Sequence, residues 1–166
     1  FLPNAAMGSR KDARDAVVAA RQAQPGWAGA PAYNRGQVLY RVAEVMESRR
    51  AQLVQDVRDS EGLSPAAAEA TVSAAIDRWV WYAGWADKFT QVLGGLNPVA
   101  GPYFDISAPE ATGVVAVLAP QRSSLLGLVS VVAPVIVSGN TAVVLTSEDR
   151  PLPAITLAEC LTTSDV

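Results

Sequence analysis

Two short polar loops carry the side chains that could do chemistry in this chain of 166 residues. The loop 119–124 follows the apolar run 113–118, and the loop 146–148 follows the apolar run 141–145. If both runs are parallel strands, the two loops meet at one edge of a sheet, where a helix N-terminus can offer N–H groups to a pyrophosphate. No G-x-G-x-x-G fingerprint is present. From the residues alone, two interpretations of these loops stay open: they form an anion-binding site, or they only connect strands to helices.

Several kinds of chemistry are excluded by composition. The sequence has no histidine, which removes the commonest general base and the usual nitrogen ligand of zinc, so no metal site is expected. Cys160 is the single cysteine; we interpret it as a buried structural thiol and expect a cytoplasmic protein. The net charge of -3 comes from interleaved acidic and basic residues, which argues against a nucleic-acid partner.

The elements that must position these loops begin with three predicted helices. Ser9 is a candidate N-cap of the first, which Pro25-Gly26 should end. A long amphipathic helix should run from after Pro31 to near Gly62, with one apolar stripe made of Leu39, Val42, Met46, Leu53 and Val57. A third should start at Ser64-Pro65 and reach Gly94-Gly95. Its aromatic residues are predicted to pack in the core rather than to stack on bases, and they are Trp79, Trp81, Tyr82, Trp85 and Phe89.

The second half of the chain has an alternating strand and helix pattern. A short strand is predicted near 103–107, and the apolar runs 113–118 and 141–145 alternate with helices at 125–137 and 152–161. Strands that are apolar on both faces indicate a parallel sheet covered on both sides, so the fold class is α/β. The run 125–137 is too short to cross a bilayer, and no membrane partner is expected. The start of the chain, Phe1-Leu2-Pro3-Asn4, lacks the layout of a secretory signal.

The two strand runs and their flanks resemble the aldehyde dehydrogenase superfamily. The family pattern is G-V-V-x-x-I-x-P-W-N-F-P, followed by A-P-A-L-A-x-G-N-x-V-V-x-K-P-S-E. It aligns without gaps with Thr112 to Pro120, Leu125-Leu126, Ala133-Pro134, Ser138 to Val144 and Ser147-Glu148. The upstream helices are also similar to family stretches, at Ala19-Ala20 with Ala23 and Trp27, at Arg35 with Leu39 and Ala43, at Gly62, and at Tyr82 to Ala86.

The resemblance implies an architecture. Residues 1–95 would be the N-terminal helical part of a cofactor-binding domain, 96–112 a crossing segment that belongs to an oligomerisation hairpin, and 113–166 the first β-α-β-α of a Rossmann-like doubly wound sheet. The expected partner is a second copy of the chain or another aldehyde dehydrogenase domain. The family's nucleophilic cysteine and glutamate base lie further downstream and have no counterpart in these residues.

The resemblance also implies site residues, and the chain departs from the family there. Arg122 stands at the asparagine that holds the oxyanion, and Leu145 stands at the lysine that reaches the adenosine ribose. Glu148 matches the glutamate that accepts hydrogen bonds from the ribose hydroxyls. Because its carboxylate would repel the 2′-phosphate of NADP, NAD would be the preferred cofactor. The remaining candidate cofactor residues are Leu118, Pro120, Gln121 and Ser147.

These departures favour one function over two alternatives. They are similar to those of degenerate second copies in tandem aldehyde dehydrogenases, so we expect a non-catalytic domain with a structural or oligomerisation role. The first alternative is part of an active NAD-dependent aldehyde dehydrogenase that oxidises an aldehyde to a carboxylic acid. The second is a nucleotide-binding module without catalysis. For the chain itself, we expect NAD as the cofactor if one binds at all, with binding that is weak or absent.

Overall fold

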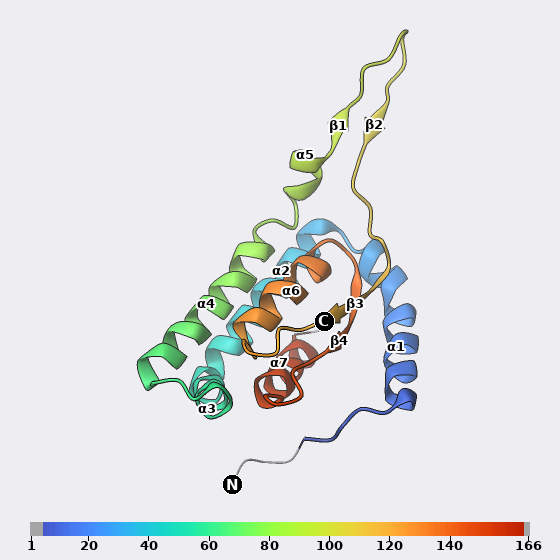
Figure 1. Cartoon of the computed structure of the whole chain (residues 1–166). Coiled ribbons are helices and arrows are strands. Elements are labelled where there is room, and N and C mark those ends of the chain that lie inside the picture. Colours follow the sequence, from blue (N-terminus) through green and yellow to red (C-terminus); the bar gives the residue numbers. More distant parts are fainter. Residues whose placement is uncertain (1–4, 165–166) are drawn as a thin grey trace.

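The computed structural model describes residues 5–164. The sequence Phe1-Leu2-Pro3-Asn4, which was interpreted above for its lack of a secretory signal, lies outside the described residues. Helices make up most of the body, a two-stranded parallel sheet lies inside it, and a thin hairpin extends away from it (Figure 1).

Helix α1 (Arg10–Gly29) begins at the predicted N-cap. The Ser9 side chain accepts a hydrogen bond from the Asp12 backbone, and the Asp12 carboxylate accepts one from the Ser9 N–H. The Ser9 hydroxyl also donates to this carboxylate, at 2.7 Å, and the two bonds from the Ser9 N–H and hydroxyl lower the pKa of the Asp12 carboxyl below its ordinary value. The predicted end at Pro25-Gly26 is wrong, because the helix continues through Pro25 to Gly29. A tertiary contact holds this last turn, since the Trp27 indole N–H donates to the Ile136 carbonyl at 2.8 Å.

The predicted long second helix is two helices, α2 (Ala32–Ser48) and α3 (Arg50–Glu61). The break falls at Arg49, whose guanidinium bonds to Gln52 and, across the molecule, to Glu159 at 2.5 Å. The apolar stripe is nevertheless confirmed, because both helices bury it completely, with Leu39, Val42, Met46, Leu53 and Val57 all at 0% exposure. Gly62 ends α3 in the left-handed conformation, with φ of 67°.

Helix α4 (Pro65–Ala83) starts at the predicted Ser64 cap but ends well before Gly94. Tight turns at 84–88 interrupt the helix, and a short helix α5 (Phe89–Leu93) follows. The prediction for the aromatic residues is correct for Trp79, which is fully buried, and wrong for Trp81, which is 55% exposed. Trp81 lies off the buried stripe of α4 and packs edge-on against the neighbouring Tyr82 ring at 4.8 Å.

The hairpin is built from β1 (Gly95–Leu96) and β2 (Ile106–Ser107), which pair antiparallel. The strand predicted at 103–107 is therefore only partly formed. The hairpin continues irregularly beyond the ladder, where the Asn97 N–H donates to the Asp105 carbonyl at 2.7 Å. Figure 1 shows this arm standing clear of the body.

The predicted parallel α/β unit is confirmed. Strand β3 (Val114–Leu118), helix α6 (Leu126–Val137), strand β4 (Thr141–Leu145) and helix α7 (Leu152–Thr163) follow one another. The two strands pair in parallel with Leu118 opposite Leu145.

The layers around this sheet explain where the core lies. Helix α1 packs against one side of the strands and α6 against the other, while α4 packs on α6, α2 and α3 (Figure 1). Buried residues of all these helices except α1 form one hydrophobic cluster with Val117 of β3. None of the helices within residues 5–164 has both the length and the apolar character that crossing a bilayer requires.

Candidate functional site

The carboxyl edge of the sheet is the place where the sequence predicted a site. Leu118 and Leu145 end the two strands side by side, and the Ala119 N–H extends the ladder by donating to the Leu145 carbonyl at 3.0 Å. Both leucine side chains point into solvent, with 77% and 66% of their surfaces exposed. Parallel pairing therefore brings the two polar loops together as expected.

A pocket of about 440 Å³ lies against the end of β4. Four of the predicted cofactor residues line it, namely Gln121, Leu145, Ser147 and Glu148. Leu118, Pro120 and Arg122 do not line this pocket, although they belong to the same edge. The N-terminal residues 5–8, together with Thr146 and Pro151, complete its wall. The sequence patterns pointed to Thr146, as part of the loop 146–148, but not to residues 5–8 or Pro151.

Gln121 fastens the two loops to each other. Its side-chain oxygen accepts the Glu148 N–H at 3.3 Å, and its amide nitrogen donates to the Ala119 carbonyl at 3.2 Å. The Ser147 hydroxyl donates to the Gln121 carbonyl at 2.9 Å, and only 4% of the Ser147 surface is exposed. Both residues therefore use hydrogen-bonding groups to hold the fold itself.

The start of α6 is also bonded within the chain. The Ser123 hydroxyl oxygen accepts the Gly127 N–H at 2.9 Å. The Glu61 carboxylate, at the end of α3, accepts both the N–H and the hydroxyl of Ser124 at 2.7 Å each. A carboxylate beside the positive end of a helix occupies the position that the sequence assigned to an anionic ligand.

Arg122 itself is exposed, and its backbone rather than its guanidinium joins the two loops. Its carbonyl accepts a hydrogen bond from the Arg150 side chain at 2.6 Å. Hydrogen bonds within the chain therefore already occupy several of the donors at this edge, among them the N–H groups of Ser124, Gly127 and Glu148.

The bond between Glu61 and Ser124 gives a first prediction. We expect Glu61→Ala to lower the free energy of unfolding by about 2 kcal/mol, because two hydrogen bonds to a charged acceptor are lost and Ser124 is buried. Chemical denaturation measures this change. Hydrogen exchange at 124–128 should accelerate in the same variant, whereas Asp59→Ala, on the exposed face of α3, should leave those amides protected. Unchanged exchange in Glu61→Ala would contradict the anchoring role.

The single cysteine does not line the pocket at the carboxyl edge. Cys160 is fully buried in α7, as predicted, and burial raises the pKa of its thiol. Its sulfur lies 4.0 Å from Nη1 of Arg49, a residue that does not line the pocket. Among residues 5–164, no group of three or more acidic or cysteine side chains is placed to hold a metal ion.

Comparison with known proteins places these features in a family. The aldehyde dehydrogenase family pattern matches residues 2–166. Aldehyde dehydrogenase 1A1 of Homo sapiens is 32% identical over 158 residues, which cover 93% of this chain and 31% of that protein. Mitochondrial benzaldehyde dehydrogenase of Antirrhinum majus is 29% identical over 161 residues, covering 95% of this chain and 30% of the relative.

Solved structures give the same result. An NAD-dependent benzaldehyde dehydrogenase from Corynebacterium glutamicum superimposes with a TM-score of 0.85 at 26% identity, over 94% of this chain and 34% of that one. PnpE in complex with nicotinamide adenine dinucleotide gives a TM-score of 0.89 at 27% identity, over 94% and 32%. The chain therefore spans about a third of the length of these proteins.

Proposed function

Because this chain belongs to the aldehyde dehydrogenase family, we propose that it is a non-catalytic segment whose role is structural. In this proposal it assembles with a second copy or with another aldehyde dehydrogenase domain. The chain corresponds to 31% of the length of aldehyde dehydrogenase 1A1, so the proposal concerns the complete polypeptide that contains these residues. The single cysteine suits a reducing compartment, and we assign the protein to the cytoplasm.

The observation that carries the proposal is the state of the carboxyl edge. Leu145 presents an exposed aliphatic side chain where the resemblance implies a lysine, so no donor reaches toward a ribose. Glu61 and Ser123 hold N–H groups at the start of α6, and Gln121 holds the Glu148 N–H. A pyrophosphate would have to compete with these bonds and with the Glu61 charge.

The oxyanion position supports the same conclusion. Arg122 replaces the asparagine that the resemblance implies, and a long, charged guanidinium does not present its N–H groups as a short amide does. Loss of one oxyanion donor typically slows acyl chemistry on the order of 10²- to 10³-fold.

The hairpin supports a role in assembly. Its strands and tip expose large apolar side chains, of which Leu96 is 67%, Tyr103 73%, Phe104 88% and Ile106 69% exposed. An apolar cluster on a projecting arm is typical of a surface that another protein covers.

One observation favours the alternative of an active NAD-dependent enzyme. The pocket at the end of β4 is open, and the exposed Glu148 lines it at the position implied for ribose recognition. A carboxylate there would accept hydrogen bonds from NAD and repel the 2′-phosphate of NADP. The same observation would suit a nucleotide-binding module that does not catalyse.

A thermal-shift titration of the full-length protein with NAD separates these functions. A ligand at about 100 times its dissociation constant adds about 2.7 kcal/mol of stability, so real binding is easy to detect. We expect no shift at millimolar NAD for the unaltered protein. The double variant Arg122→Asn with Leu145→Lys should show a thermal shift at the same NAD concentration, because a charged donor is restored beside Glu148.

Two results would contradict the proposed non-catalytic role, and a matched variant controls for the two substitutions. A clear shift with the unaltered protein would favour the nucleotide-binding alternative. An accompanying increase in NADH absorbance with an aldehyde would overturn the non-catalytic role altogether. Lys11→Leu with Asp15→Asn, on the exposed face of α1, is a matched double variant that should leave NAD affinity unchanged.

A further inference from the structure

Arg35 uses only two of its three guanidinium nitrogens within the described residues. Its Nε donates to the Val137 carbonyl, and its Nη1 donates to the carbonyls of Ala28 and Ala30. Its Nη2 forms no hydrogen bond with any of residues 5–164. Arg35 is nevertheless only 7% exposed, and a buried guanidinium that contacts only neutral acceptors keeps most of the cost of leaving water. The fold therefore favours a carboxylate beside Nη2.

Arg35 lines a pocket of about 540 Å³ at the base of the hairpin. The rest of the wall comes from the end of α1, from α5, from Ser138, and from residues 109–111, which lead from the hairpin back to β3. Glu110 belongs to that last segment and is the one acidic residue among the described residues that line the pocket. A carboxylate and a buried guanidinium therefore share one pocket.

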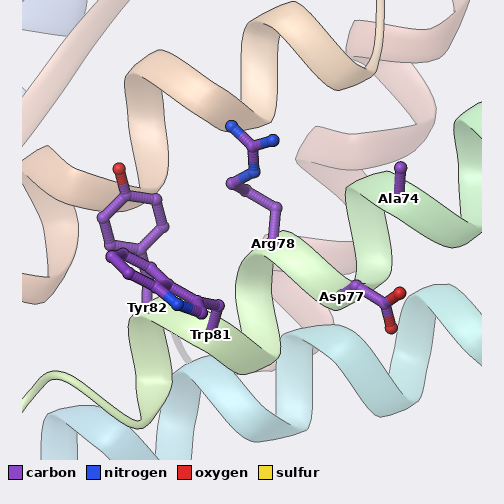
Figure 2. A pocket seen from close by; sticks show the side chains of 5 residues that line it. All are labelled: Ala74, Asp77, Arg78, Trp81 and Tyr82. Carbon is purple, nitrogen blue, oxygen red and sulfur yellow. The ribbon is translucent and has the colours of Figure 1, made fainter.

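Sharing a pocket does not by itself make an arginine and an acidic residue pair, and α4 shows why. Figure 2 shows Arg78 and Asp77, which line another pocket. The Arg78 guanidinium extends toward α6, where it donates to the Ser130 hydroxyl at 3.0 Å, and the Asp77 carboxylate lies away from it. Both side chains are exposed, so water already stabilises their charges and pairing would add little. Burial is what distinguishes Arg35.

The chain next to Glu110 already lies close to the Arg35 guanidinium. The two segments meet at Gly139, which has a φ of 83°. A Cβ atom built on Gly139 would lie 3.7 Å from Cζ of Arg35 and 3.5 Å from Cβ of Ala111, the residue that follows Glu110. Glu110 takes part in none of the ion pairs found among residues 5–164. A rotation of its long side chain, without movement of a helix, can therefore bring its carboxylate to Arg35.

We propose that Glu110 and Arg35 form an ion pair that fastens residues 109–111, and with them the base of the hairpin, to the body. The pair forms when the Glu110 carboxylate accepts a hydrogen bond from Nη2, the donor that the helix carbonyls do not use. Closure of the pair fixes the point from which the hairpin extends, and opening of the pair releases it. The pair therefore controls how firmly the hairpin is held.

The balance of charge around Arg35 favours the pair. The ends of α1 and α6 each carry about half an elementary negative charge, which is spread over several carbonyls. A carboxylate carries a full charge and meets one nitrogen directly, so its hydrogen bond is roughly twice as strong as a neutral one. Burial also lowers the pKa of the Arg35 guanidinium, and an adjacent carboxylate would offset that penalty by favouring the charged form.

The ion pair is independent of the structural role proposed above. It concerns contacts within one chain at the base of the hairpin, whereas assembly concerns the exposed residues of the hairpin strands and tip. Neither an active carboxyl edge nor a monomeric protein would contradict it.

Hydrogen exchange of the full-length protein tests the ion pair. The reporters are two amides at the point where the chain returns from the hairpin to the sheet. Gly113 donates to the Asn140 side chain at 2.8 Å, and Thr141 donates to the Gly113 carbonyl at 3.1 Å. Glu110→Gln removes the charge at nearly constant volume and should accelerate exchange at both amides at least about fivefold. In an Arg35→Met background, where the pair is already lost, Glu110→Gln should have no further effect.

Salt provides a second measurement that needs no substitution of Arg35. Raising the ionic strength from about 0.1 M to about 1 M shortens the screening length from about 10 Å to about 3 Å. The unaltered protein should then exchange at least about threefold faster at both amides, whereas Glu110→Gln should not respond, because it has no pair to screen. Asp77→Asn, which removes the acidic residue of the pocket in Figure 2, is the matched control and should behave as the unaltered protein does.

Three results would overturn the ion pair. The first is unchanged exchange in Glu110→Gln, which would mean that Arg35 is held by its carbonyls alone or by a carboxylate elsewhere in the polypeptide. The second is a salt response that persists in Glu110→Gln. The third is an acceleration by Glu110→Gln that is equally large in the Arg35→Met background, because the effect would then not pass through Arg35. If Arg35→Met does not fold, the comparison of the two salt responses decides by itself.

Discussion

Replacement of Trp79 by alanine should lower the free energy of unfolding by about 3–5 kcal/mol, the range for truncating a buried aromatic side chain. Trp79 is fully buried in α4, where that helix packs on α2 and α6. The surrounding helices cannot fill the space of an indole without losing their own contacts, so a cavity should remain. Urea denaturation followed by circular dichroism measures the change.

A second substitution at this position separates volume from polarity. Among the described residues, the indole N–H of Trp79 is buried without a hydrogen-bond acceptor, which costs stability in the unaltered protein. Trp79→Phe removes that donor along with part of the volume, so it should lower stability by only about 1 kcal/mol. Tyr33→Ala, an aromatic truncation at a position that is 66% exposed, should change stability by less than about 0.5 kcal/mol. Equal losses for Trp79→Ala and Tyr33→Ala would contradict the assigned core.

The elements that the sequence predicted well are those with one dominant physical signal. The apolar runs 113–118 and 141–145 have no polar face to expose, and the helix between them requires a crossover that makes the strands parallel. Helix starts at Ser9 and Ser64 were also predictable, because a capping side chain acts on N–H groups only a few residues away.

Helix ends were less predictable, because distant residues decide them. The last turn of α1 passes Pro25 since Trp27 bonds to Ile136, 109 positions along the chain. At the break between α2 and α3, the Arg49 guanidinium bonds to Glu159, 110 positions away. Neither partner leaves a local signal near the helix that it affects.

The candidate site also has one part that the sequence predicted and one part that it did not. Parallel pairing alone is enough to bring the ends of β3 and β4 together, and the sequence predicted that edge. It could not predict that Glu61, 63 positions before Ser124, bonds to that residue. Residues 5–8 also line the pocket, and no sequence pattern predicted that they would. The sequence locates the edge, while the structure shows which of its donors are already in use.

Arg35 is the buried charge on which the junction of α1 and α6 depends. Only 7% of its surface is exposed, and burial lowers the pKa of its guanidinium. Nε donates to the Val137 carbonyl at the end of α6 at 3.3 Å, and Nη1 donates to the carbonyls of Ala28 and Ala30 at the end of α1. One cation therefore serves the negative ends of two helices, whose last carbonyls have no partners within their own helix.

Arg35→Ala should lower the free energy of unfolding by about 3 kcal/mol, because it leaves these carbonyls without their donor and opens a space beside them. Arg35→Lys keeps the charge but not the planar set of donors, so it should recover only part of that loss. Urea denaturation of both variants, beside Arg14→Ala on the exposed face of α1 as a control, provides the comparison. The assigned role would be wrong if Arg35→Ala lowered the free energy of unfolding no more than Arg14→Ala does. Water would then replace the guanidinium at the helix ends, and only apolar contacts with the sheet would hold the two helices.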